Sequence, residues 1–245
     1  MSQPSLIGKS ALVTGGSRRI GREIALSLAR AGADVTITYR NSDAEAAQTV
    51  EAIETLGCRA LAVECDVRSE GSVRAAVHAV HQKFGRLDLL INNAAVFESS
   101  PLESISVEAW DTVFETNARG PFLVARESLP HLRAAEGRII NMGSLGGMHA
   151  WADHAHYCGS KAALHMLTQA MAKAFAPQVS VNCVAPGWIE FGDQAAEAGS
   201  RFAARTPMRR NGSAQDVAEA VLFFATGPKF ITGQILVVDG GMGLV

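Results

Sequence analysis

The chain has 245 residues, of which 48% are hydrophobic and 19% are charged. This composition excludes a disordered or fibrous chain, and the length suits a single α/β domain that spans residues 1–245. Lys plus Arg number 22 and Asp plus Glu number 24, and the resulting net charge of −2 argues against a sequence-independent nucleic-acid binder.

The sequence shows no clear targeting signal and no clear metal-binding motif. No run approaches the ~18 consecutive apolar residues of a membrane helix, and the first residues lack the pattern of a secretory signal. None of the four cysteines forms a C-x-x-C pair, so they are interpreted as reduced thiols. His149, His154 and His156 have no Cys or carboxylate cluster at the usual ligand spacings. We therefore expect a cytoplasmic protein with no membrane partner and no metal.

Short β-branched runs alternate with longer helical runs along the chain. Strands are expected at 10–14, 34–39, 59–64, 87–91, 137–142, 179–184 and 234–238. Helices are expected at 19–31, 43–56, 70–84, 157–175 and 216–225, and one or more helices at 107–132 with a break near Gly120 and Pro121. The alternation predicts a doubly wound Rossmann fold, with a seven-stranded, mostly parallel sheet covered by helices on both faces. Such sheets bind ligands beyond the carboxyl ends of their strands.

A glycine-rich turn, TGGSRRIG at residues 14–21, joins the first strand to the first helix. Glycines let a backbone turn sharply against a pyrophosphate, whose charge then faces the helix N-terminus. The turn is not G-x-G-x-x-G, so an ordinary tight turn is the alternative. The candidate cofactor contacts here are Gly15, Ser17, Arg18, Arg19, Ile20 and Gly21.

The second strand ends without the acid that usually holds the ribose 2′-hydroxyl of NAD. The residues at this point are Tyr39, Arg40, Asn41 and Ser42. An arginine with small donors suits a 2′-phosphate through charge-assisted hydrogen bonds, which favours NADPH over NADH. A solvated surface arginine is the alternative.

Polar residues follow other strands at the same edge. Asp66, after the third strand, suits either an adenine amino group or the cap of the next helix. Asn93 and Ala94 follow the fourth strand, where they can line a pocket or stabilise the end of the sheet. After the sixth strand, the segment 188–210 has the small and apolar residues of a substrate lid, with an ordinary surface insertion as the alternative.

The string YCGSK at residues 157–161 carries the strongest chemical signal. Tyr157 and Lys161 share a helix face, and a nearby ammonium lowers the pKa of a phenol, which is ordinarily near 10. A chance surface pair is the alternative, but Ser144 follows the fifth strand, where a hydroxyl can hold a carbonyl oxygen. Asn117 is a poor helix former inside a predicted helix, which indicates either a functional role or a buried structural amide.

Together these residues resemble the short-chain dehydrogenase/reductase family from about Gly8 to Gly241. The motifs, in order, are TGGSRRIG, CDV, NNAA, Asn117, Ser144, YCGSK, PGWI and VDGG. The resemblance implies that Tyr157 is the general acid, that Lys161 lowers its pKa and binds the nicotinamide ribose, and that Ser144 polarises the carbonyl. It also implies that Asn117 holds a proton-relay water. The implied cofactor contacts are Gly15 and Gly21 at the pyrophosphate, Asp66 and Val67 at the adenine, Asn93 and Ala94 at the adenosine, and Pro186, Gly187 and Ile189 near the carboxamide.

The sequence departs from the family pattern in four places. Arg19 replaces the usual middle glycine of the turn, Gly143 stands where a serine often precedes the catalytic serine, and Phe191 replaces a threonine. In addition, NNAA replaces the commoner NNAG. The T-G-x-x-x-R-x-G turn is similar to that of pteridine reductases, although those commonly carry an aspartate at the position of Ser144.

The resemblance leaves three functions open. We expect a reductase of ketones or 3-oxoacyl compounds, with a pteridine (C=N) reductase as the alternative and a non-catalytic NADP(H) sensor as an alternative of another class. The substrate is a small molecule in the first two cases. The family further implies a homotetramer or a homodimer.

Overall fold

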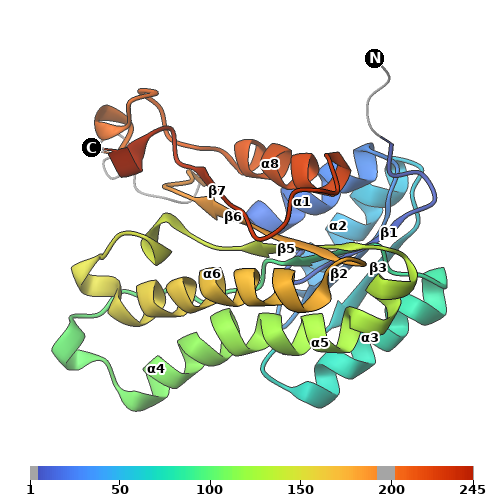
Figure 1. Cartoon of the computed structure of the whole chain (residues 1–245), viewed down its shortest axis with the longest axis horizontal. Coiled ribbons are helices and arrows are strands. Elements are labelled where there is room, and N and C mark those ends of the chain that lie inside the picture. The colour runs from blue at the N-terminus through green and yellow to red at the C-terminus, as the bar shows by residue number, and fades with distance from the viewer. Residues whose placement is uncertain (1–4, 192–201, 245) are drawn as a thin grey trace.

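Seven parallel strands form one sheet in the computed structural model shown in Figure 1, in the order β3-β2-β1-β4-β5-β6-β7. The structure describes residues 5–191 and 202–244. The strands are β1 (Ser10–Val13), β2 (Asp34–Tyr39), β3 (Ala60–Glu64), β4 (Leu89–Asn92), β5 (Arg138–Met142), β6 (Ser180–Pro186) and β7 (Ile235–Val238). The predicted doubly wound fold is confirmed, and the sheet is wholly parallel across these strands.

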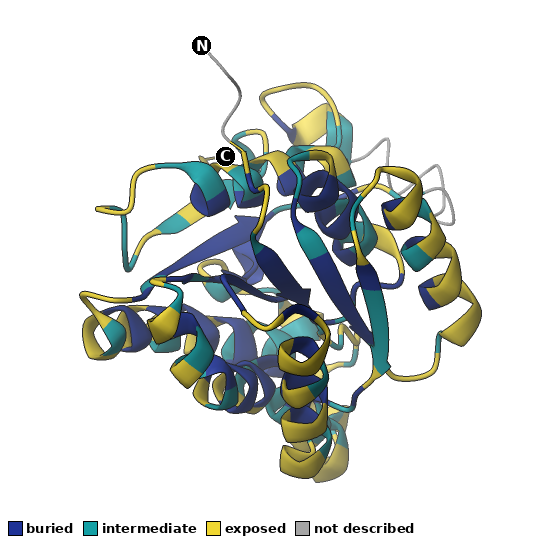
Figure 2. Ribbon diagram, turned by 90° about the vertical axis from the view of Figure 1, so that its right-hand side faces the viewer, coloured by how far each residue is buried: buried dark blue, intermediate teal, exposed yellow. Residues whose placement is uncertain are grey.

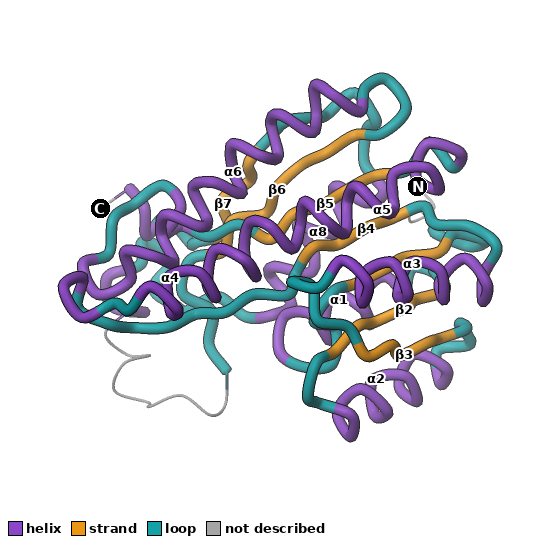
Figure 3. The backbone as a smooth tube through the Cα atoms, turned by 90° about the horizontal axis from the view of Figure 1, so that it is seen from below, coloured by secondary structure: helices purple, strands orange, loops and turns teal. Residues whose placement is uncertain are grey.

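Helices cover both faces of the sheet (Figures 1 and 3). One face carries α1 (Arg19–Arg30), α2 (Asp43–Thr55) and α8 (Ala214–Thr226). The other face carries α3 (Glu70–Phe84), α4 (Val107–Phe114), α5 (Gly120–Ala134) and α6 (Ala155–Phe175). Helix α6 begins two residues before the predicted start, at Ala155.

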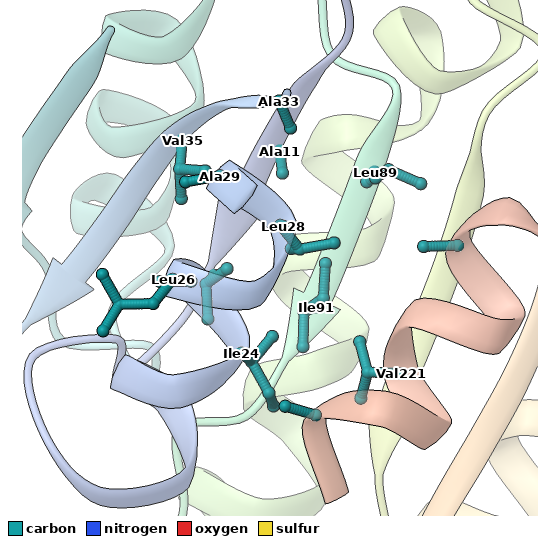
Figure 4. Packing of buried hydrophobic residues seen from close by; sticks show 14 of the residues in the cluster. Ala11, Ile24, Leu26, Leu28, Ala29, Ala33, Val35, Leu89, Ile91 and Val221 are labelled. Atoms are coloured by element: carbon teal, nitrogen blue, oxygen red, sulfur yellow. The ribbon is translucent and has the colours of Figure 1, made fainter. Parts of the chain in front are cut away.

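The sheet separates two apolar cores, one on each face, because successive strand residues point to opposite faces. In β1, Val13 packs into the core beneath α1 and α8, whereas Leu12 packs into the core beneath α3 and α5. Figure 4 shows Ile24 of α1, Ile91 of β4 and Val221 of α8 meeting in the first of these cores. The strands are accordingly buried on both sides, while the outer helix faces are exposed (Figure 2).

A π-helical segment, Glu115–Arg119, joins α4 to α5. The break predicted near Gly120 therefore exists, and it lies one turn earlier in the chain. Single π turns inside α-helices occur frequently at functional sites. Here the wide turn places Asn117 in a fully buried position facing α6.

Within residues 5–191 and 202–244, no helix is both long and apolar enough to span a bilayer. Residues 192–201, which form part of the predicted substrate segment 188–210, lie outside the described residues.

Candidate active site

A cavity of about 800 Å³ opens at the carboxyl edge of the sheet. It lies beside the point where the chain order reverses between β1 and β4, which is where doubly wound sheets bind ligands. The predicted cofactor residues all line it, namely Gly15, Ser17, Arg18, Arg19, Ile20, Gly21, Tyr39, Arg40, Asn41, Ser42, Asp66, Val67, Asn93, Ala94, Pro186, Gly187 and Ile189. Ser144, Tyr157 and Lys161 line the same cavity. The predicted residues therefore meet in one place.

The glycine-rich turn is held against the end of β4, and the backbone approaches too closely at Gly15 and Gly21 for a side chain to fit. Gly15 has a φ of +64°, and a Cβ added to Gly21 would lie 2.2 Å from the Gly15 carbonyl oxygen. The Asn93 side-chain amide donates to the carbonyl oxygens of Thr14 and Gly15, each at 2.9 Å. The Thr14 hydroxyl in turn accepts from the backbone N–H groups of Asn93 and Ala94. This bare backbone cradle fits the pyrophosphate of a dinucleotide.

Arg19 occupies the left-handed region of the backbone map, with a φ of +51°. Residues other than glycine rarely adopt this conformation, so the family's glycine at this position has a physical reason. The Arg19 guanidinium lies 5.2 Å from the ring centroid of Phe191. Two of the four departures from the family pattern are thus in contact with each other at the cavity.

Two exposed arginines line the end of the cavity near β2. These are Arg18 and Arg40, and no acid lies between Tyr39 and Ser42, although Glu45 of α2 also lines the cavity. The carboxylate of Asp66 accepts hydrogen bonds from the side chain of Arg68, which holds the pKa of Asp66 below its ordinary value. Asp66 therefore does not add an unpaired negative charge beside Arg40.

The cap predicted as one alternative for Asp66 is wrong. Ser69 is the N-cap of α3, and its hydroxyl accepts from the backbone N–H of Ser72. Two residues lie between Asp66 and this cap, and the Asp66 carboxylate accepts from the side chain and the N–H of Arg68 instead. This leaves Asp66 at the wall of the cavity, consistent with the other alternative.

Ser144, Tyr157 and Lys161 come together where β5 ends beside α6. Ser144 and Tyr157 both line the cavity, and the Ser144 side chain acts to lower the pKa of the Tyr157 phenol. The Ser144 Oγ accepts a hydrogen bond from the Gly146 N–H at 3.1 Å. Lys161 is 3% exposed, and its Nζ donates to the Met142 carbonyl oxygen at 2.8 Å. Burial lowers the pKa of Lys161 to about 8.

The expectation that Lys161 lowers the pKa of Tyr157 is not met in this structure. Burial raises the pKa of Tyr157, and the hydrogen bond with Ser144 opposes that rise only in part. The Lys161 ammonium lies 5.7 Å from the centroid of the tyrosine ring and is bound to the Met142 carbonyl instead. Tyr157 is therefore a neutral phenol at pH 7, a state that can donate a proton.

Asn117 is not on the cavity wall. Its side chain accepts from the Val96 N–H at 2.8 Å and donates to the Val96 carbonyl at 2.9 Å and to the Ser160 hydroxyl at 3.1 Å. The amide thus ties the segment after β4 to α6, as the structural alternative expects. Its role in holding a proton-relay water stays a prediction.

Aromatic side chains surround Tyr157, and sequence reasoning did not find them. The Phe97 ring meets Tyr157 edge-on at 4.8 Å and stacks on His154 at 4.5 Å. The Trp151 ring lies nearly parallel to that of Tyr157, with centroids 6.2 Å apart. The position of Phe97 just after NNAA was the only available signal, since the contacts join residues distant in the chain.

A doubly wound sheet with a glycine-lined nucleotide cradle and a Ser–Tyr–Lys set defines a class of dinucleotide-dependent oxidoreductases. A family model described as enoyl-(acyl carrier protein) reductase matches residues 15–243. The chain belongs to the short-chain dehydrogenase/reductase family, whose members use a nicotinamide cofactor.

Relatives with several functions resemble the whole chain. The 3-oxoacyl-(acyl-carrier-protein) reductase of Staphylococcus aureus is 38% identical over 240 residues, which cover 96% of this chain and 98% of that protein. Trihydroxynaphthalene reductase of Colletotrichum orbiculare is 36% identical, covering 98% and 91%. A blue fluorescent protein from a metagenomic library, solved with NADPH, has a TM-score of 0.91 and 34% identity, covering 97% and 99%. A dehydrogenase/reductase from Sinorhizobium meliloti has a TM-score of 0.92 and 37% identity, covering 97% and 96%.

Proposed function

We propose that this protein is an NADPH-dependent reductase of ketones, with Tyr157 as the general acid. The observation that carries the proposal is that Ser144, Tyr157 and Lys161 meet on the wall of the cavity that the glycine cradle also lines. Purified protein should oxidise NADPH in the presence of a ketone, which the loss of absorbance at about 340 nm measures. A protein that binds NADPH but turns over no carbonyl or imine would instead be the non-catalytic sensor.

The cofactor preference is supported by charge at the end of β2. Arg40 and Arg18 are exposed at the cavity, and of the two acids that line it here, Asp66 is paired with Arg68 and Glu45 is exposed on α2. A 2′-phosphate would gain charge-assisted hydrogen bonds here, whereas a 2′-hydroxyl finds no carboxylate in the segment 39–42. The NADPH bound by the metagenomic relative is consistent with this choice.

The proposed roles follow from the positions of the side chains. When bound, the reduced nicotinamide supplies the hydride. Ser144 and Tyr157 hold the carbonyl oxygen, and the neutral phenol of Tyr157 donates its proton as negative charge develops there. The buried Lys161, which also lines the cavity, would hold the cofactor ribose through its ammonium. Tyr157 and Lys161 lie on one helix and Ser144 follows one strand, and these elements keep the three side chains oriented.

The proposed substrate is a planar aromatic ketone. Phe97 and Trp151 contact the Tyr157 ring, and His154 contacts both of them. Trp188 and Phe202 form a second stacked pair at the same cavity, with ring centroids 4.1 Å apart. Flat rings stack on such walls more favourably than a flexible chain does. The naphthalene-reducing relative has a substrate of this shape by its name, and the acyl-carrier-protein reductase does not.

Replacing Phe97 by leucine should raise the KM for a bicyclic aromatic ketone about fivefold, because one aromatic contact is worth about 1 kcal/mol. The KM for a linear 3-oxoacyl thioester should change by less than about twofold. Steady-state kinetics with both substrates measure this difference. Phe230→Leu is the matched control, because Phe230 is fully exposed and does not line the cavity. Equal effects of Phe97→Leu on both substrates would contradict the aromatic assignment.

A pteridine reductase is the second candidate, and the contact between Arg19 and Phe191 favours it. Both side chains line the cavity, and together they present a cation and a ring face to a flat, polar heterocycle. Oxidation of NADPH with a dihydropterin, together with no oxidation with aromatic ketones, would decide for this function. The intact Ser144 is the observation against it.

We also propose a homo-oligomer. The helices α4, α5 and α6 present exposed apolar side chains on their outer faces, namely Val107, Trp110, Phe122 and Met166. Monomers rarely leave a large apolar surface on neighbouring helices in contact with water. Light scattering of the purified protein distinguishes a dimer or tetramer from a monomer.

A further inference from the structure

His165 is a buried histidine next to the reactive groups, and neither the sequence patterns nor the proposed mechanism uses it. It lies on α6 four residues after Lys161, so Tyr157, Lys161 and His165 follow one another on the same helix face. The side chain is 6% exposed. Its Nε2 accepts a hydrogen bond from the backbone N–H of Ser144 at 3.3 Å. The imidazole therefore links the helix that carries Tyr157 to the loop that carries Ser144.

Two glycines make room for this imidazole. A Cβ added to Gly143 would lie 2.3 Å from Nε2 of His165, and one added to Gly147 would lie 2.6 Å from its Cε1. A Cβ at Gly143 would also lie 2.6 Å from Cys183 Sγ, and one at Gly147 would lie 2.9 Å from the backbone carbonyl carbon of Lys161. Gly143 is the position where the family often has a serine. This departure from the family pattern is thus explained by the space that His165 occupies.

The protonation state of His165 agrees with its geometry. Burial and the neighbouring charge of Lys161 lower the pKa of His165 to about 4, so the ring is neutral at pH 7. A neutral imidazole that accepts at Nε2 carries its proton on Nδ1. The Cys183 thiol of β6, which like His165 lies near Lys161 and Gly143, is neutral too because burial raises its pKa to about 12.

We propose that His165 is a positioning residue for the reduction, and this inference rests on the proposed function. By accepting the backbone N–H of Ser144, the imidazole holds the Ser144 hydroxyl at the correct place beside Tyr157. The backbone N–H groups of residues 146–149 donate back to residues 144 and 145, and the Gly143 N–H donates to Val184 of β6. Lys161 and Cys158 of α6 bond to the carbonyl oxygens of Met142 and His149, which lie on either side of Ser144. His165 is the side chain of α6 that bonds the backbone of Ser144 itself.

His165→Leu should lower kcat for ketone reduction about tenfold to hundredfold, because it leaves the Ser144 N–H unpaired and frees the loop. The KM for NADPH should stay within about twofold. His165→Gln should recover most of kcat, because the glutamine oxygen can accept where Nε2 does. His78→Leu is the matched control, since His78 is exposed on α3. Equal kcat in His165→Leu and the native protein overturns the proposal.

A double-mutant cycle separates positioning from a general loss of structure. In a Ser144→Ala background, His165→Leu should lower the single-turnover rate by less than about twofold, because the hydroxyl that it positions is absent. The same fold loss in both backgrounds overturns the proposal. Should His165→Leu fail to fold, His165→Asn serves instead, because its side chain is too short to reach the Ser144 N–H, and equal activity of the Asn and Gln variants overturns the proposal.

These outcomes are distinct from failure of the proposed function. If Tyr157→Phe leaves turnover unchanged, the proposed function is wrong and the inference falls with it. If Tyr157→Phe abolishes turnover while His165→Leu leaves kcat unchanged, only the positioning role is wrong.

The buried imidazole also predicts an acid dependence of stability. Its pKa is about 4 in the folded chain, against an ordinary value of 6.5, so the unfolded chain binds more protons between these values. The free energy of unfolding should therefore fall as the pH decreases from 6.5 toward 4. In His165→Gln this part of the decrease should be missing, which urea unfolding at several pH values measures. Parallel pH curves for the two proteins would mean that His165 is not held as a neutral acceptor.

Discussion

Tyr157→Phe should lower kcat for ketone reduction by about three orders of magnitude, because general acid catalysis by a positioned side chain contributes factors of about 10² to 10⁴. Phenylalanine keeps the ring that contacts Phe97 and Trp151 but has no proton to donate. Single-turnover oxidation of NADPH with an aromatic ketone measures the effect.

Two further measurements make this result specific to proton donation. NADPH affinity, followed by the change in its fluorescence, should alter by less than about threefold in Tyr157→Phe, since the cradle at Gly15 and Gly21 is untouched. The thermal unfolding midpoint should not fall, because a partly buried hydroxyl is removed without a cavity. Unchanged turnover in a folded, NADPH-binding variant would rule out Tyr157 as the acid.

Arg40→Asp should lower kcat/KM for NADPH about a hundredfold and leave that for NADH within about threefold. The substitution removes a charge-assisted hydrogen bond to the 2′-phosphate and adds a repelling carboxylate. It also supplies the acid that holds a ribose 2′-hydroxyl in NAD-binding folds. Kinetics with each cofactor at a fixed ketone concentration measure the change in preference.

The matched control for charge reversal is Arg133→Asp. Arg133 is exposed near the end of α5, at the opposite edge of the sheet from the cavity, because α5 leads into the amino end of β5. It should leave the preference between the cofactors unchanged. Equal losses with NADPH and NADH in Arg40→Asp would show that Arg40 does not contact the phosphate.

The fold follows from local patterns, and it was predictable for that reason. Strands of consecutive buried residues, such as Leu89–Asn92, alternate with helices, and parallel connections of this kind are almost always right-handed. Element ends were less accurate. Strand β6 runs on to Pro186, because the ladder with β7 continues to the pair of Pro186 and Val238, which no local signal records.

The reactive residues were predictable where spacing alone brings them together. Tyr157 and Lys161 meet through helix periodicity, and Ser144 lies at a strand end, where parallel sheets place their ligands. The pKa values of these side chains were not predictable from their spacing in the sequence. The pKa of Tyr157 depends on its burial and on the bond that Lys161 makes with Met142, and both are consequences of packing.

The sequence by itself determined the alternation of strands and helices, the glycine turn, the absence of an acid after the second strand and the Ser–Tyr–Lys set, because each depends on residues near one another in the chain. Only the tertiary structure decided that Asp66 pairs with Arg68, that Arg19 meets Phe191 and that His165 binds the backbone of Ser144. Side-chain orientation and long-range packing decide these contacts. They form between residues that are far apart in the chain, and the order of residues along the chain does not show which of them will meet.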